Sequence, residues 1–171
     1  ARVIAQLGPD AADAVGAIAD VLPDSDDESE QELLLALGAI GPKAESALPQ
    51  IAKALSSKDE KVRYSAVYAL GKIGPAAKKE VPALRQNLGN DDTFYRTVSA
   101  WALVEIDPDG DYIVRDTVPI LIIALEHERG FVQLGPKAKE AIPVLQKLID
   151  DENEDAPVRA AAQEALKKIE G

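Results

Sequence analysis

The chain of 171 residues contains no cysteine and no methionine, and it has a single histidine and a single tryptophan. Without cysteine there can be no disulfide, no thiolate nucleophile and no zinc–thiolate site. The single histidine, His127, stands beside Glu128, a pairing typical of solvated side chains rather than of a metal centre. The sequence therefore predicts no catalytic group, metal or cofactor, while the redox compartment stays open.

Basic residues are also too few for several classes of partner. The chain has 19 Lys and Arg against 30 Asp and Glu, which gives a net charge of −11. Nucleic acids and anionic membranes both require a basic surface, so neither is expected as a partner. No apolar run approaches the roughly 18 residues of a membrane span, because Pro119 interrupts the longest one. An acidic chain of this kind is compatible with a basic protein partner.

What the sequence does contain is a repeat. An apolar residue followed by Gly and Pro recurs every 33 residues, and each Gly suits a helix C-cap while each Pro suits the start of the next helix. A second Pro eight residues after the Gly predicts a kink in that helix. The markers are Leu7-Gly8-Pro9, Ile40-Gly41-Pro42 and Ile73-Gly74-Pro75, then Ile106-Asp107-Pro108 and, after only 28 residues, Leu134-Gly135-Pro136; the second prolines are Pro49, Pro82 and Pro143.

Each unit thus reads as two amphipathic helices joined by short turns, and neighbouring units must stack to bury their apolar faces. The segment from Val62 to Gly74, "VRYSAVYALGKIG", resembles the second helix and exit turn of a HEAT-like repeat, and the phycobilisome-lyase type is the nearest variety. The resemblance implies an all-α fold, a right-handed α-solenoid of about five helical hairpins in a single domain, residues 1–171. The units are approximately 1–8 (partial), 9–41, 42–74, 75–107, 108–135 (irregular) and 136–171.

The resemblance also assigns a structural role to acid–base pairs that stand four residues apart. In HEAT-like arrays such pairs form a ladder between neighbouring repeats. The first unit departs from the pattern because Asp26 is followed by Glu30, so the ladder should be broken there. The predicted ladder residues are Asp59, Arg63, Asp92, Arg96, Asp155 and Arg159.

The fourth unit is irregular in two places. Four extra residues precede Pro119, and nine residues are missing before Gly135, where the intra-unit turn and the start of the second helix should lie. Either that helix is cut to about two turns, or a loop has been removed or left out of this chain. The stretch "DPDGD", residues 107–111, has alternating oxygen ligands but lacks the Gly and Glu positions of a full calcium loop. It is interpreted as a polar turn lengthened by insertion.

One column of the repeat points to function. Leu35, Tyr68 and Trp101 occupy the same slot of successive second helices, on the side expected to face away from the core and to line the concave surface. Tyr and Trp are enriched at interface hot spots, but they also cover grooves between repeats, and both interpretations stand. The slots one turn before and after complete a set that we call the second-helix stripe: Leu35, Tyr64, Tyr68, Thr97, Trp101 and Glu105.

The function indicated is a non-catalytic scaffold that binds a protein or peptide on the second-helix stripe. Two alternatives remain open. The resemblance to lyase-type repeats implies a chromophore-handling protein of the bilin-lyase kind. The opening "ARVIAQLGP" falls within a helical pattern, so the chain is also expected to be a structural segment of a larger solenoid, which would self-associate through exposed terminal faces.

Overall fold

The computed structural model describes residues 6, 8–117, 120–121 and 142–150, and near the C-terminus residues 156, 159–160, 162–163 and 166–167. The chain forms two compact units, Ala1–Pro108 and Asp109–Gly171. The prediction of one domain with the stated repeat boundaries stays a prediction. The nine-residue deletion, His127 and the marker at Gly135 lie outside the described residues.

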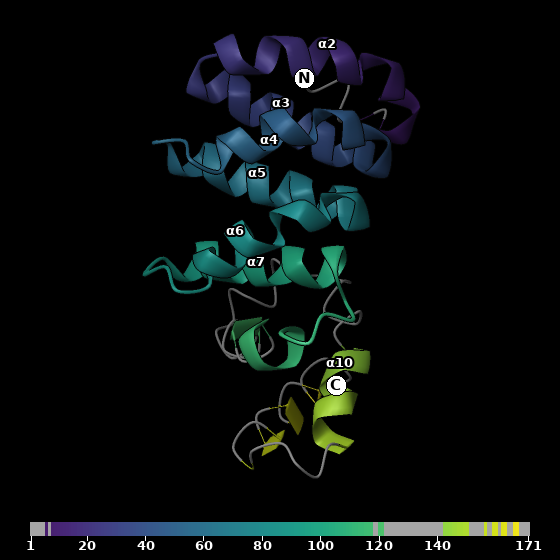
Figure 1. Ribbon diagram of the computed structural model, residues 1–171, viewed down its shortest axis with the longest axis vertical. Coiled ribbons are helices and arrows are strands. Elements are labelled where there is room, and N and C mark those ends of the chain that lie inside the picture. The colour runs from purple at the N-terminus through teal and green to yellow at the C-terminus, as the bar shows by residue number, and fades with distance from the viewer. Residues whose placement is uncertain are drawn as a thin grey trace. The chain divides into compact units, whose positions relative to one another are not determined.

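The first compact unit, Ala1–Pro108, contains three helical pairs stacked one upon another (Figure 1). Each pair begins with a 3-10 segment that continues into a short α-helix and ends with a 14-residue α-helix. The elements are η1 (Gly8–Ala14), α2 (Val15–Val21), η2 (Leu22–Asp24) and α3 (Asp27–Ile40); η3 (Gly41–Ala47), α4 (Leu48–Ala54) and α5 (Glu60–Ile73); and η4 (Gly74–Glu80), α6 (Val81–Asn87) and α7 (Thr93–Ile106).

In the second unit the described elements are the π-helix η5 (Ile113–Thr117) and the α-helix α10 (Ile142–Asp150). The described residues form helices, turns and bends, and none of them forms a strand. The predicted fold class, an all-α solenoid of helical hairpins, is confirmed. Among the described helices, none is long and apolar enough to cross a membrane.

Gly and Pro act at the turns as their positions predict. Gly41 and Gly74 end α3 and α5 with φ of 72° and 76°, values that a residue with a side chain rarely adopts. A kink at the second proline stays a prediction. The first helix changes from 3-10 to α beside that proline in two pairs, because α4 begins one residue before Pro49 and α6 one residue before Pro82. In the first pair, which has Gly16 at this slot, the change falls at Val15.

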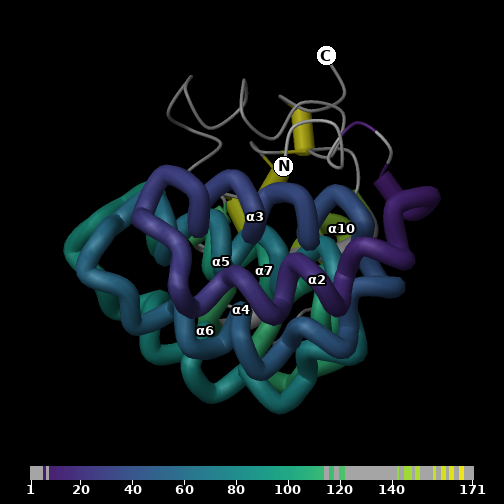
Figure 2. Tube along the Cα trace, turned by 90° about the horizontal axis from the view of Figure 1, so that it is seen from above, coloured from purple at the N-terminus to yellow at the C-terminus, as the bar shows by residue number. Residues whose placement is uncertain are grey.

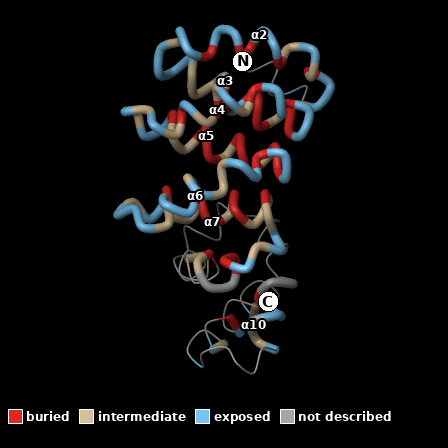
Figure 3. Tube along the Cα trace, in the orientation of Figure 1, coloured by how far each residue is buried: buried red, intermediate tan, exposed pale blue. Residues whose placement is uncertain are grey.

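The helices of the first unit form two layers. Figure 2 shows α2, α4 and α6 on one side and α3, α5 and α7 on the other. The second helices are packed on each other through small and branched residues that are fully buried, and Figure 3 shows this buried row along their length. This buried row includes two sets of residues that recur every 33 positions and are all 0% exposed: Ala36, Ala69 and Ala102, and Leu37, Leu70 and Leu103. Alanine allows close approach of the helix backbones, and that approach positions the stripe residues of neighbouring repeats side by side.

Candidate partner-binding face

The second-helix stripe comes from three successive helices. Leu35 lies on α3, Tyr64 and Tyr68 lie on α5, and the remaining members lie on α7. Leu35 is 38% exposed, one of the few large apolar side chains to be so, whereas the others are partly buried. The stripe is therefore neither a closed core nor a fully solvated surface.

Tyr68 and Trp101 form the centre of the stripe. Their rings are stacked, with centroids 5.6 Å apart and an interplanar angle of 21°. The indole Nε1 of Trp101 donates a hydrogen bond of 3.1 Å to Oε1 of Glu105, one turn later on α7. The structure thus brings three predicted site residues from two repeats into one group, with the indole donor held by a carboxylate.

Each of these rings lies against a helical glycine of the preceding repeat. A Cβ atom built on Gly71 would stand 2.6 Å from Cζ3 of Trp101, and one built on Gly38 would stand 3.0 Å from Cε1 of Tyr68. The rings therefore occupy the space that a side chain at these glycines would fill. Sequence reasoning missed this contact, although a signal exists, because each ring follows its glycine by 30 residues.

Tyr64 makes different contacts. Its hydroxyl donates a hydrogen bond to the carboxylate of Asp92, and its ring lies 5.1 Å from that of Phe94 and 5.5 Å from that of Tyr95 between centroids. Burial, and then the hydrogen bond to Asp92, raises the pKa of Tyr64 to about 12. Thr97 donates to the carbonyl of Thr93 at 2.8 Å. Tyr64 therefore contacts the next repeat at a different place, and Thr97 bonds within α7. Neither belongs to the Tyr68–Trp101 group.

The aspartates of the predicted ladder cap helices. Oδ1 of Asp59 accepts hydrogen bonds from the backbone N–H groups of Lys61 and Val62, at 2.8 and 3.1 Å. Asp92 caps α7 in the same way. In the first pair Asp26 also caps its helix, and its bond from the N–H of Ser29 lowers the pKa of the carboxyl. Each cap satisfies donors that the first turn leaves unpaired.

The ladder arginines turn back onto the preceding loop. Arg63 donates to the carbonyls of Ser57 and Lys58, at 2.8 and 2.9 Å, and Arg96 makes the equivalent bonds to Asn90 and Asp91. These bonds hold each intra-unit turn to its own second helix.

Contact between repeats comes through the same groups. The guanidinium of Arg63 lies 5.8 Å from the ring centroid of Tyr95. The pKa of Asp92 is lowered, first by the hydrogen bond from Tyr64 and to a smaller degree by the charge of Arg63. A ladder along the whole array stays a prediction, and Asp155 lies outside the described residues.

No group of three or more Asp, Glu or His side chains within the described ranges is placed to hold a metal ion. Asp107, the first residue of the "DPDGD" turn, forms an ion pair of 2.8 Å with Lys78. That ion pair therefore joins η4, at the start of the third helical pair, to the residue that follows α7.

The comparisons with known proteins agree with this architecture. Residues 1–104 match the family model described as HEAT repeats. The crystal structure of an engineered protein from the Northeast Structural Genomics Consortium is similar, with a TM-score of 0.56 and 21% identity over 99% of this chain and 88% of that chain. A second engineered protein from the same consortium has a TM-score of 0.57 and 23% identity over 99% of this chain and 53% of that chain.

No curated protein sequence matched the chain. The family match does not distinguish a phycobilisome-lyase subtype, so that part of the resemblance stays a prediction. The match covers well over half of the chain, and the stacked helical pairs, positive-φ glycines and capped second helices lie within it. The chain belongs to the family of HEAT-repeat proteins.

Proposed function

We propose that this protein is a non-catalytic scaffold that binds a partner protein or peptide on the second-helix stripe. The observation that carries the proposal is that Leu35, Tyr68 and Trp101 are all partly exposed at the same slot of three successive repeats, with Tyr68 stacked on Trp101. HEAT repeats commonly mediate protein interactions, and flat aromatic side chains provide large contact area at low entropic cost. The rings are already held by packing and by Glu105, so binding would require little further ordering.

The test compares two exposed apolar residues of the same helical pair. Leu35 on α3 belongs to the stripe, whereas Val21 on α2 is 53% exposed and belongs to the other layer. Either residue can be changed to lysine without entering the core. A partner that uses the stripe should lose about 2 kcal/mol, or about thirtyfold in affinity, with Leu35→Lys and little with Val21→Lys.

The experiment is affinity capture from a native lysate with quantitative mass spectrometry, followed by titration of the captured partner. Circular dichroism confirms that each variant remains helical. A partner retained equally by wild type and by Leu35→Lys would contradict the proposal, as would a chain that captures nothing above the bare matrix.

A further inference from the structure

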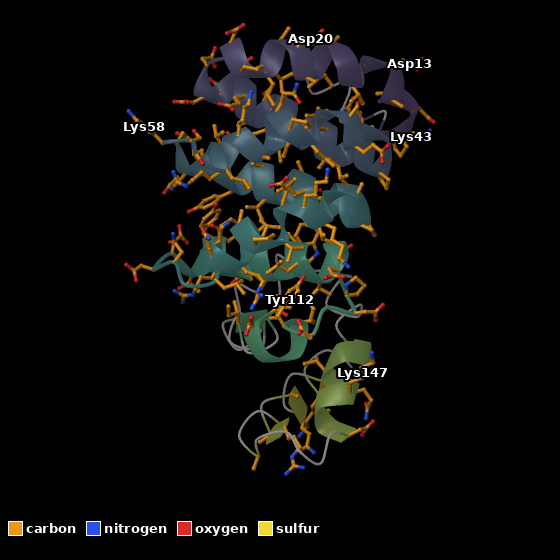
Figure 4. All side chains as sticks on the ribbon, viewed as in Figure 1. Asp13, Asp20, Lys43, Lys58, Tyr112 and Lys147 are labelled. Carbon is orange, nitrogen blue, oxygen red and sulfur yellow. The ribbon has the colours of Figure 1, made fainter. Side chains whose placement is uncertain are left out.

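The negative charge of this protein is concentrated in its first helical pair. Residues 3–42 contain nine of the 30 acidic residues and none of the 19 basic ones. The rest of the chain therefore has 21 acidic and 19 basic residues and is nearly balanced. Seven of the nine carboxylates are exposed, among them Asp13 and Asp20, which Figure 4 shows on this pair.

No Lys or Arg lies within residues 3–42 beside these carboxylates. Glu30 shows the effect, because partial burial, and then the charges of Asp27 and Asp59, raises the pKa of its carboxyl. Asp26 uses its oxygens to cap α3. The potential around the exposed carboxylates of this pair is therefore negative.

A slot beside the second-helix stripe, on the same face of the second helices, differs between the repeats. Glu28 is exposed and lies two turns before Leu35, so the two share one face of α3. In the next two repeats the slot of Glu28 holds Lys61 and then Phe94, and Phe94 is 43% exposed. The face that carries the stripe thus has the exposed carboxylate of Glu28 on α3 and the exposed ring of Phe94 on α7, where the half-buried carboxylate of Glu105 accepts the hydrogen bond from Trp101.

We infer that the occupant of the stripe is a protein segment with a cluster of Lys or Arg at one end and aromatic or aliphatic side chains at the other. The basic end lies on α3 beside Glu28, and the apolar end lies on Tyr68, Trp101 and Phe94. This inference rests on the proposed scaffold function and adds the chemistry and the direction of the partner. Charge complementarity at one end fixes the register and raises the association rate, while the apolar end supplies contact area.

The spacing of the helices sets the length of such a segment. Packed helices are about 8–10 Å apart, so α3 and α7 are separated by about 20 Å across α5. An extended chain advances about 3.3 Å per residue. The basic cluster and the apolar anchor should therefore be about six residues apart if the segment is extended.

The test begins with a phage library of random twelve-residue peptides, selected on the full chain in about 50 mM salt. Selected peptides should have Lys or Arg at one end and aromatic or aliphatic residues at the other. Charge reversal in the first pair, Asp24→Lys with Asp27→Lys and Glu28→Lys, changes three exposed carboxylates that do not cap a helix. The matched control, Glu45→Lys with Glu60→Lys and Asp91→Lys, makes the same change in total charge in the second and third pairs.

Affinity for the best selected peptide, measured by fluorescence anisotropy, should fall about tenfold or more with the first-pair reversal and less than about threefold with the control. The difference should shrink at about 0.5 M salt, where charges are screened within a few ångströms. If the reversal disturbs α3, the neutral set Asp24→Asn, Asp27→Asn and Glu28→Gln replaces it, with an expected loss of about threefold. Circular dichroism shows which set remains folded.

The outcomes separate the two proposals. Apolar peptides without basic residues, bound through Leu35 and Trp101, would leave the scaffold function standing and overturn the direction inferred here. An equal loss of affinity with both charge reversals would overturn it as well. Basic peptides that are unaffected by Leu35→Lys, or no selected peptide at all, would contradict the proposed function and this inference together.

Discussion

The contact between Gly71 and Trp101 predicts that a substitution which normally stabilises a helix will be harmful here. Replacing a helical Gly by Ala gains about 1 kcal/mol from backbone entropy. At Gly71 the new Cβ would stand 2.6 and 2.8 Å from two ring atoms of Trp101 and 3.1 Å from Cα of Ala102, where ordinary carbon contacts are about 3.5–4.0 Å. Overpacking of this kind costs about 1–3 kcal/mol, so Gly71→Ala should destabilise the protein by about 1 kcal/mol.

The same substitution at two further glycines should change the stability by different amounts. At Gly38 the nearest atoms belong to the ring of Tyr68, at 3.0 and 3.1 Å, so gain and cost should nearly cancel in Gly38→Ala. At Gly16 nothing lies within 4 Å of the added Cβ, so Gly16→Ala should stabilise by about 0.5–1 kcal/mol. The expected order of stability is Gly16→Ala, then Gly38→Ala, then Gly71→Ala.

Urea unfolding followed by circular dichroism measures the order, and fluorescence of Trp101, the single tryptophan, reports the local change. A double-mutant cycle with Trp101→Leu should show that most of the cost of Gly71→Ala disappears when the ring is absent. The reasoning would be refuted if Gly71→Ala were as stabilising as Gly16→Ala, because the ring of Trp101 would then not lie on α5.

Three other predictions concern α7 and its junction with α5. Ser99 is fully buried and its hydroxyl has no hydrogen-bond partner among the described residues, so Ser99→Ala should stabilise by about 1 kcal/mol in urea unfolding. Asp92→Ala removes the cap of α7 and should cost about 1 kcal/mol, with faster hydrogen exchange at Phe94 and Tyr95. The raised pKa of Tyr64, about 12 against 10.0 when unfolded, means that its contribution is complete below pH 10 and is lost as pH rises to about 12. Tyr64→Phe should therefore flatten the decline of the melting temperature in that pH range, and an unchanged slope would contradict the burial of Tyr64 and its hydrogen bond to Asp92.

Much of the fold could be predicted because the repeat marks it by backbone chemistry. Gly41 and Gly74 have the positive φ that their position after an apolar residue indicates, and the second prolines stand where the α-helix restarts. These features are local, so one stretch of sequence suffices to predict them.

The details of the candidate site depend on the register between helices, which a single repeat does not show. The resemblance to HEAT-like repeats implied a ladder of aspartate and arginine between repeats, which stays a prediction. It did not indicate that Arg63 donates to loop carbonyls or that Asp59 accepts from backbone N–H groups. Likewise, the packing of Tyr68 on Gly38 depends on how closely α3 and α5 approach, which is decided by alanines elsewhere in both helices.

The two junctions between the three helical pairs are unequal, and this has a consequence for how the array comes apart. The second junction has Tyr64 bonded to Asp92 and packed against Phe94, whereas the matching slots of the first junction hold Gln31, Asp59 and Lys61. In a linear array, the coupling at each interface decides how easily that interface opens. The second junction depends on a few polar and aromatic side chains, so Asp92→Ala should shorten the protection lifetimes of α7 amides more than those of α3 amides. A partner that spans α3 to α7 would cross both junctions, so its binding should slow amide exchange in all three second helices.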